Sequence, residues 1–227
     1  MDIKNVNYYK FIIFGFLAVV IIILFYSFYN QSGYNSRVAP ELIAKEINNY
    51  EGEDLSSIND FRENSIKGPQ YINRDDYRLK ISGTSETGVE MLSYDDIINN
   101  NQSYKEVITL NCVEGWSVKI LWEGILVKDL IKRENIPSEV NTIIFKAYDG
   151  YSTSFPIEYI YDNDIMLAFK MNGVELPPER GWPFQLVAES KYGYKWIKWI
   201  TEIEFSTDSN YRGYWESRGY SDSAEIK

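Results

Sequence analysis

Residues 11–29 form an uninterrupted apolar run, FIIFGFLAVVIIILFYSFY, without a charged side chain. Because a helix rises 1.5 Å per residue, such a run spans roughly 28 Å, which is about the apolar thickness of a bilayer. Lys4 and Lys10 precede it, and the next basic residue is Arg37. Positive charge favours the cytoplasmic side of a membrane. The pattern therefore predicts a single-pass transmembrane anchor, with residues 1–10 in the cytoplasm and the chain after it outside.

Two other structures fit this run less well. A cleaved signal peptide has a shorter apolar core and ends at small residues, and SFYNQSGYNS at 27–36 offers no good cleavage site. A buried core helix that is apolar on every face is rare. We therefore expect an uncleaved signal anchor, a cell-membrane location and an extracytoplasmic domain.

The composition narrows the chemistry. The chain has no histidine and one cysteine, Cys112, which excludes Ser-His-Asp and Cys-His catalysis, histidine metal sites and an intrachain disulfide. The formal net charge of -10 argues against nucleic acid as a partner, because phosphates repel an acidic surface. Hydrophobic residues make up 44% of the chain, enough for a packed core.

The chain after the anchor divides into three parts. Residues 30–70 are predicted to be a polar stalk with two short helices, residues 71–207 one domain, and residues 208–227 a tail that packs on it. Alternation and turn residues predict strands at 77–83, 104–114, 117–124, 141–150, 184–190 and 194–205, and a hairpin around Asn172-Gly173. Helical patterns cover 92–100, 125–135 and 157–162. In the first of these, Ser93 with Asp96 three residues on predicts a start of the capping-box kind. Strands mixed with short helices, without a βαβ repeat, predict an α+β fold.

Cys112 lies in the stretch TLNCVEGWSV, residues 109–118. Its neighbours Ile108, Leu110 and Val113 are apolar, which fits a small buried core residue. The other interpretation is a thiolate at a strand end that serves as a ligand or a nucleophile. These residues alone leave both open.

A basic segment follows at 177–200, PPERGWPFQLVAESKYGYKWIKWI. Positive charge gathers here in an otherwise acidic chain, on Arg180, Lys191, Lys195 and Lys198. The segment is either a solvated strand face, with its tryptophans packed inside, or a site for an anion such as a phosphate.

Four motifs in one order resemble a known family. LNCVEGWSV, AYDGYS, LPPERGWPFQLVAESKYGYKWIKWI and RGYWESRGY are similar to the molybdopterin domain of the sulfite oxidase superfamily. Its small prokaryotic members, related to the periplasmic methionine-sulfoxide reductase catalytic subunit, are the most similar. The likeness begins at about Tyr71. It implies a mixed-sheet molybdopterin-binding fold, and an oxidoreductase that transfers an oxygen atom at molybdenum, with tungsten as an alternative metal.

The resemblance also implies residue roles. Cys112 matches the cysteine that ligates the metal through sulfur, which suits a soft thiolate. With Cys112, the candidate catalytic residues are Asp149 and Tyr151, in a turn near the metal's open face. Further cofactor-binding positions correspond to Arg180, Gln185, Trp196, Ile197 and Lys198, of which Arg180 and Lys198 are expected to hold the phosphate.

This chain departs from that pattern at several positions. Gln185 stands where the methionine-sulfoxide reductase members have arginine. Arg180 stands where they have asparagine, and Trp196 where they have serine. We find no counterpart of their upstream pocket segment before Tyr71.

The leading hypothesis is a membrane-anchored, extracytoplasmic, molybdopterin-dependent oxidoreductase with a small-molecule substrate. No haem motif (CxxCH) is present, so an external electron donor or acceptor is expected, either a protein or a quinone-linked partner. The alternative is a non-catalytic anchored binding domain that kept the fold, with YRGYWESRGY contacting a partner. A carboxylate hydrolase is the third hypothesis. Its candidate pairs, Asp95/Asp96 and Glu202/Glu204, have the adjacent or alternating spacing typical of solvated faces.

Overall fold

The computed structural model describes residues 38–84 and 88–226. The predicted anchor at 11–29 and the cytoplasmic segment at 1–10 lie outside the described residues, so both stay predictions. Among the residues that are described, no helix combines the length and apolarity needed to cross a membrane. Residues 38–226 all fall within one compact unit of the chain.

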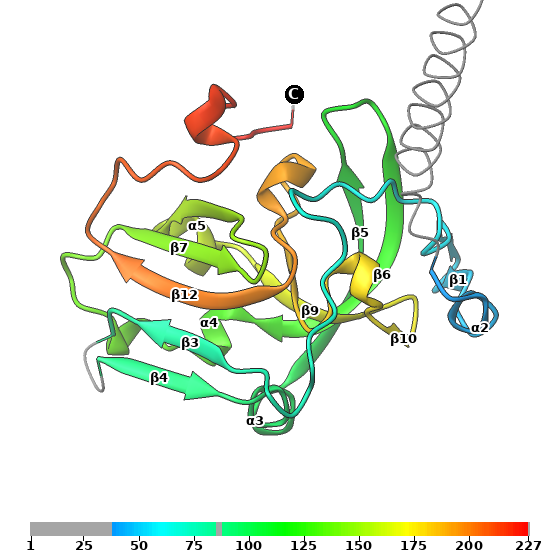
Figure 1. The fold of residues 1–227 in the computed structure, drawn as a ribbon, viewed down its shortest axis with the longest axis horizontal. Helices are drawn as coiled ribbons and strands as arrows, with labels where there is room; N and C mark the ends of the chain where they lie inside the picture. Colours follow the sequence, from blue (N-terminus) through cyan, green and yellow to red (C-terminus); the bar gives the residue numbers. More distant parts are fainter. Residues whose placement is uncertain (1–37, 85–87, 227) are drawn as a thin grey trace, which may run out of the picture. The chain divides into compact units, whose positions relative to one another are not determined.

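The first of two five-stranded sheets is antiparallel and has the order β10-β9-β6-β5, with β11 also paired to β9 (Figure 1). Its long hairpin joins β5 (Ser103–Asn111) to β6 (Ser117–Leu126). The other strands are β9 (Met166–Met171), β10 (Val174–Glu175) and β11 (Gln185–Val187). The β5–β6 turn carries Cys112, at the end of the strand predicted from the sequence.

The second sheet is mixed and has the order β4-β3-β12-β7-β8. It contains β3 (Leu79–Ser82), β4 (Val89–Leu92), β7 (Thr142–Ala147), β8 (Ser152–Pro156) and β12 (Ile200–Ser206). Strand β12 runs parallel to β3 and antiparallel to β7, so Ile203 lies opposite both Ile81 and Phe145. The predicted mixed-sheet α+β fold is confirmed.

The core joins side chains from both sheets. Strand β6 supplies Trp122, β7 supplies Phe145, and β12 supplies Ile203, all without exposed surface, and these belong to one hydrophobic cluster. Burying each such side chain stabilises the fold by about 1.5–3 kcal/mol. Large side chains from β6, β7 and β12 therefore contribute to one core shared by the two sheets.

Two local predictions hold in detail. Helix α3 (Tyr94–Asn100) begins with a capping box, in which Ser93 Oγ accepts from the Asp96 N–H and the Asp96 carboxylate accepts from the Ser93 N–H. The β9–β10 hairpin turns at Asn172 and Gly173, both with positive φ. Helix α5 (Ile157–Asp162) also forms as expected.

Two other predictions were wrong about extent. The helix expected over 125–135 is reduced to α4 (Val127–Leu130) and a short 3-10 turn, η1 (Arg133–Asn135). Pairing explains this, because β6 continues through Leu126 and Ile125 lies opposite Leu167 of β9. The strand expected over 194–205 begins only at Ile200, after the 3-10 turn η3 (Gly193–Lys195).

Residues 38–70 are part of the folded unit and differ from the stalk that was expected. They form α2 (Pro40–Ile43), the hairpin of β1 (Asn49–Tyr50) and β2 (Glu53–Asp54), and an irregular segment. Val38 and Ile58 are buried in the core. The second expected helix is absent from this segment, where the Ser57 N–H donates to the Asp60 carboxylate. Such local side-chain contacts compete with helix formation.

Candidate functional site

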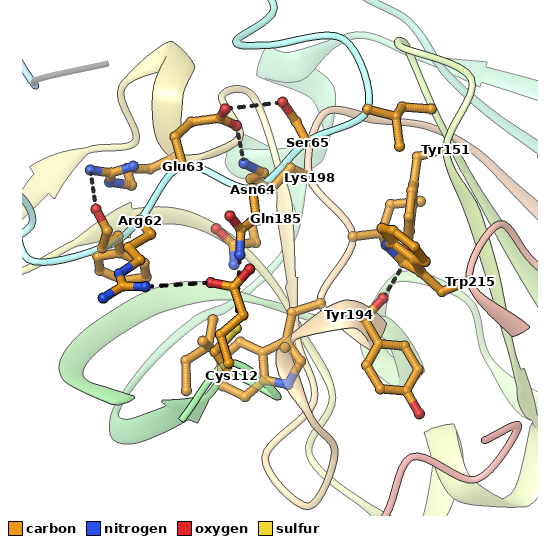
Figure 2. A pocket seen from close by; sticks show the side chains of 18 of the residues that line it. Arg62, Glu63, Asn64, Ser65, Cys112, Tyr151, Gln185, Tyr194, Lys198 and Trp215 are labelled. Carbon is orange, nitrogen blue, oxygen red and sulfur yellow. Dashed lines mark hydrogen bonds and ion pairs between the residues drawn. The ribbon is translucent and has the colours of Figure 1, made fainter. Parts of the chain in front are cut away.

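One cavity of about 330 Å³ brings together all eight predicted site residues. They are Cys112, Asp149, Tyr151, Arg180, Gln185, Trp196, Ile197 and Lys198. They come from the β5–β6 turn, the β7–β8 turn and the basic segment, which lie far apart in the sequence (Figure 2). The structure thus places them together, while their individual roles stay predictions.

Cys112 sits in a tight turn at the cavity wall. Its N–H donates to the Trp116 carbonyl over 2.9 Å, and its carbonyl accepts from the Gly115 N–H over 3.0 Å. Gly115 has a φ of 85°, a left-handed conformation that glycine adopts without strain. Cys112 is only partly buried and lines the cavity. Burial is the main cause that raises the pKa of this thiol, and the Asn64 amide nitrogen lies 3.8 Å from the sulfur.

Arg180 closes the short 3-10 turn η2 (Pro178–Arg180) and is 3% exposed. Its Nε donates to the Ile58 carbonyl over 2.9 Å, and its Nη2 to the Phe61 carbonyl over 3.4 Å. The guanidinium also lies 5.0 Å from the centre of the Phe61 ring. Burial lowers the pKa of Arg180 to about 10. The guanidinium therefore fastens segment 58–61 to the basic segment.

Lys198 forms an ion pair with Glu63. The Nζ–Oε1 distance is 2.7 Å, and the two side chains are only 16% and 6% exposed. Burial lowers the pKa of Lys198, whereas Glu63 acts in the opposite direction. Gly181 makes this arrangement possible, since a Cβ there would lie 3.0 Å from the Lys198 Cβ and its φ is 99°. Lys198 thus brings its charged group to the cavity wall, where Glu63 pairs with it.

Gln185 begins β11 and is 3% exposed, yet it lines the cavity. Among residues 38–84 and 88–226, no side-chain hydrogen bond of Gln185 is formed. Its amide is not a fully enclosed unpaired group, a condition that applies to Glu216 Oε2 in this part of the chain. The amide therefore faces the cavity and is free to bind a ligand there.

Trp196 and Ile197 form a buried part of the cavity wall. Trp196 donates through Nε1 to the Lys191 carbonyl over 2.9 Å and packs edge-on against Trp122 at 5.9 Å. Ile197 is 2% exposed and belongs to the hydrophobic core. The Trp196 ring is thus held in place by the protein itself.

The β7–β8 turn holds Asp149 and Tyr151. Asp149 is 2% exposed, and its Oδ1 accepts from the Tyr151 N–H over 2.9 Å. The Tyr151 hydroxyl donates to the Tyr194 carbonyl. Burial raises the pKa of Tyr151 well above its usual value, so the phenol remains protonated at neutral pH.

Segment 61–66 is the site feature that the sequence analysis missed. No pocket segment was found before Tyr71, but the structure places Phe61, Glu63 and Asn64 in the cavity wall. The stretch INDFRENS was interpreted as part of a stalk helix. Its density of Asn, Asp and Glu was the available signal, because these residues favour irregular backbone and polar sites.

This fold and cavity define an oxidoreductase domain of the molybdopterin type. The chain belongs to the family described as "Oxidoreductase molybdopterin binding domain", whose model matches residues 66–215. The predicted resemblance to the sulfite oxidase superfamily is confirmed, and membership assigns the chain to the molybdopterin-dependent oxidoreductases with molybdopterin as the family cofactor.

Named relatives cover parts of the chain. The "Uncharacterized oxidoreductase YuiH" of Bacillus subtilis is 29% identical over 67% of this chain and 76% of that protein. The "Protein-methionine-sulfoxide reductase catalytic subunit MsrP" of Xanthomonas campestris is 28% identical over 67% of this chain. The match spans 54% of its own length, about half of that relative.

A solved structure supports the fold alone. The sulfane dehydrogenase SoxCD from Paracoccus pantotrophus matches with a TM-score of 0.58 and 22% identity. The match covers 62% of this chain and 41% of that chain.

The cavity residues fit the family cofactor in three respects. Cys112 presents a sulfur, which suits molybdenum or tungsten. Gln185 presents an amide to the cavity that makes no side-chain hydrogen bond in the described part of the chain. Lys198 presents a largely buried cation that suits a phosphate, although in the structure Glu63 occupies it.

Proposed function

We propose that the chain is a membrane-anchored, extracytoplasmic oxidoreductase that transfers an oxygen atom at a Cys112-ligated molybdenum or tungsten centre. The observation that carries this proposal is that the partly buried Cys112 lines the same cavity as Gln185 and Lys198. The anchor rests on the apolar run at 11–29, and the location on the charge on either side of it.

Bound molybdopterin would supply a metal that exchanges two electrons and an oxygen atom with the substrate. The balanced reaction is XO + 2 electrons + 2 protons, giving X + water, and it can run in either direction. An external donor or acceptor, a protein or a quinone-linked partner, would provide or take the electrons.

The chain's own residues would divide the remaining work. Cys112 would ligate the metal, and Asn64 would donate to its sulfur. Lys198 would neutralise the phosphate, and the Gln185 amide would bind the pterin. Arg180 would act by holding segment 58–61 in the wall, because its donors already face backbone carbonyls.

Asp149 and Tyr151 would shape access to the metal. The partly buried Tyr151 phenol stays protonated, and its donation to the Tyr194 carbonyl fixes it in place. Trp196 and Ile197 would exclude water from the cofactor side of the cavity, since both are almost fully buried.

A non-catalytic binding domain is the second candidate. The observation that favours it is the Lys198–Glu63 ion pair, which neutralises the cation expected to meet the phosphate. Gln185, in place of an arginine, removes a second positive charge.

The test is the metal content and metal ligation of the full chain, purified from a host that makes the cofactor. We expect about one molybdenum or tungsten per chain. X-ray absorption at the metal edge should show one sulfur neighbour fewer in Cys112→Ser than in the wild type, with Thr109→Ser as a control outside the cavity.

Two results would contradict the proposal. A wild-type protein without metal from a competent host supports the binding-domain candidate. A metal-loaded Cys112→Ser protein with the same number of sulfur neighbours and the same turnover excludes Cys112 as the ligand.

A further inference from the structure

The C-terminal segment 211–220 forms one wall of the cavity through its aromatic rings. Trp215 and Tyr220 line the cavity beside Tyr151 and Tyr194. The rings contact one another in sequence, with centroid distances of 5.7 Å for Tyr151–Tyr214, 5.2 Å for Tyr214–Trp215 and 5.0 Å for Trp215–Tyr220. Tyr194 completes the group at 5.2 Å from Tyr220. We call these five residues the aromatic wall.

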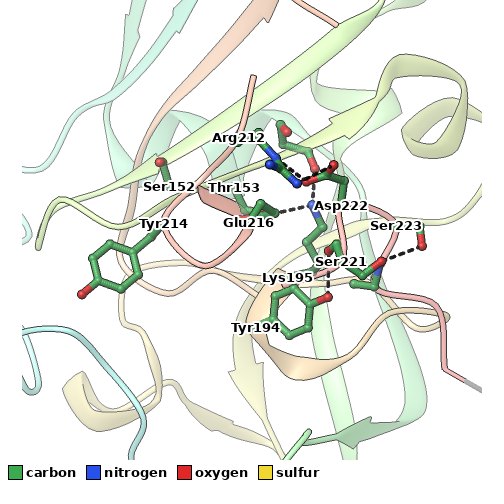
Figure 3. A network of polar contacts seen from close by, with 12 residues as sticks. Ser152, Thr153, Tyr194, Lys195, Arg212, Tyr214, Glu216, Ser221, Asp222 and Ser223 are labelled. Atoms are coloured by element: carbon green, nitrogen blue, oxygen red, sulfur yellow. Dashed lines mark hydrogen bonds and ion pairs between the residues drawn. The ribbon is translucent and has the colours of Figure 1, made fainter. Parts of the chain in front are cut away.

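The buried ion pair Lys195–Glu216 supports the aromatic wall from outside the cavity lining (Figure 3). Glu216, next to Trp215, accepts from Lys195 Nζ and from the Thr153 hydroxyl, each over 2.6 Å. The Lys195 and Glu216 side chains are 2% and 1% exposed. Removing one partner of such a pair leaves a buried charge uncompensated. The pair therefore fixes where residue 215 can lie.

Backbone contacts also hold segment 211–220 against β8. The Tyr214 N–H donates to the Ser152 carbonyl over 2.9 Å. A Cβ on Gly213 would lie 2.3 Å from that carbonyl oxygen, so only glycine allows this approach. Farther along, the Tyr194 hydroxyl donates to the Ser221 carbonyl. Segment 211–220 is thus fixed to the fold as part of the cavity wall.

The charges of the cavity point to the kind of molecule that this wall faces. In the described part of the chain, the two cavity-lining cations that are largely buried have acceptors of their own, because Arg180 donates to carbonyls and Lys198 pairs with Glu63. The third, Arg62, is 68% exposed to solvent, where its charge is screened, and it lies 3.9 Å from Glu114. An oxyanion is recognised best by an Arg or Lys that is free to donate to it. Aromatic faces instead favour apolar groups.

We propose that the aromatic wall, positioned by the Lys195–Glu216 pair, selects a small uncharged substrate with apolar substituents over an oxyanion. Trp215 and Tyr220 contact the substrate, and Lys195 and Glu216 are positioning residues. The proposal rests on the proposed function, which assigns Lys198 to the cofactor phosphate and so removes it from the substrate.

The test compares two probes of similar shape that differ in charge, dimethyl sulfone and methanesulfonate. Each carries methyl protons, so saturation-transfer NMR on the metal-loaded full chain reports its contact with aromatic rings and yields a dissociation constant. We expect dimethyl sulfone to bind about tenfold more tightly. Trp215→Ala and Tyr220→Ala should each weaken its binding about fivefold, the size of a lost ring contact.

Control variants separate the wall from general effects. Tyr148 is 60% exposed and does not line the cavity, so Tyr148→Ala should leave both dissociation constants unchanged. Glu216→Gln keeps the side-chain size but removes the charge. It should weaken dimethyl sulfone binding and increase amide hydrogen exchange across residues 213–220, at wild-type metal content.

Two results would overturn the proposal. The first is methanesulfonate binding as tightly as dimethyl sulfone, and the second is unchanged binding of dimethyl sulfone in both Trp215→Ala and Tyr220→Ala. Should Glu216→Gln fail to fold, these two variants still decide the matter. The metal content of each sample is assayed, so that the proposed function and the role of the aromatic wall are tested separately. Absence of metal contradicts the proposed function. The ratio of the two dissociation constants decides the role of the aromatic wall.

Discussion

Lys198 Nζ lies 2.7 Å from Glu63 Oε1, and this ion pair links two segments that are 135 positions apart in the chain. The pair joins the basic segment to segment 61–66, and both segments line the cavity. Because both side chains are largely buried, the ammonium group of Lys198 and the carboxylate of Glu63 each stabilise the charge of the other. Another anion can pair with Lys198 only if Glu63 moves away or if Lys198 contacts both anions.

The first prediction is a coupling energy for this pair. Lys198→Met should lower the free energy of unfolding by about 3–5 kcal/mol, since it leaves Glu63 as a buried carboxylate without a cation. Lys198→Met/Glu63→Gln should recover at least about 2 kcal/mol of that loss. Urea unfolding at matched metal content measures both. A loss below about 1 kcal/mol in Lys198→Met would show that the pair is solvated in solution.

The second prediction concerns Arg180 and segment 58–61. Arg180→Lys keeps the charge but loses the fork that reaches the carbonyls of Ile58 and Phe61. Amide hydrogen exchange in residues 59–66 should therefore become faster, while exchange in β6 and β9 stays as in the wild type. Equal protection of residues 59–66 in both proteins would contradict the assigned role of the guanidinium.

The third prediction is the pH dependence of Cys112. Burial raises the pKa of its thiol, so the thiolate forms at higher pH than in an exposed cysteine. In metal-free protein, iodoacetamide should alkylate Cys112 more slowly than a model thiol at pH 8, and the rate should keep rising after that of the model thiol has levelled off. Cys112 is the only cysteine, so mass spectrometry reads one site.

Asn64 provides the matched variant for this measurement. Its amide lies 3.8 Å from the sulfur and lowers the pKa of Cys112. Asn64→Ala should move the alkylation profile to still higher pH. A profile like that of the model thiol in the wild type, or a shift to lower pH in Asn64→Ala, would count against the geometry described for this turn.

The fourth prediction tests the packing between β6 and β9. A Cβ on Gly124 would lie 2.4 Å from the Leu167 carbonyl oxygen, beside the irregular pairing at Glu123. Gly124→Ala should cost about 3 kcal/mol, because backbone cannot move away as a flexible side chain can. Gly52→Ala, at an open turn with positive φ, should cost about 1 kcal/mol. Thermal unfolding of the two variants compares them, and equal losses would refute the close contact.

Local patterns predicted much of this fold. The capping box at Ser93, the Asn172-Gly173 turn and the strand before Cys112 depend on residues that are neighbours in sequence, and each formed as expected. The helix over 125–135 failed because its first residues pair with β9, a partner about forty positions away that periodicity does not reveal.

The candidate site shows the same difference between features that depend on sequence neighbours and features that depend on distant contacts. Its members in the β5–β6 turn, the β7–β8 turn and the basic segment came from motifs with a recognisable order. Segment 61–66 was not predicted as part of the site, and Trp215 was noted only within the motif RGYWESRGY, because their position at the cavity depends on distant contacts, Arg180 with Phe61 and Lys195 with Glu216. A sequence read locally carries no sign of such contacts.

The placement of β12 between β3 and β7 has a consequence for biosynthesis. Strand β12 spans Ile200–Ser206, and it pairs with β3 and β7, which are made earlier. A nascent chain emerging from the ribosome cannot close the second sheet before β12 has emerged, nor assemble the aromatic wall before Trp215 and Tyr220 have followed it. A cofactor held in this cavity would therefore enter only after those residues have been synthesised.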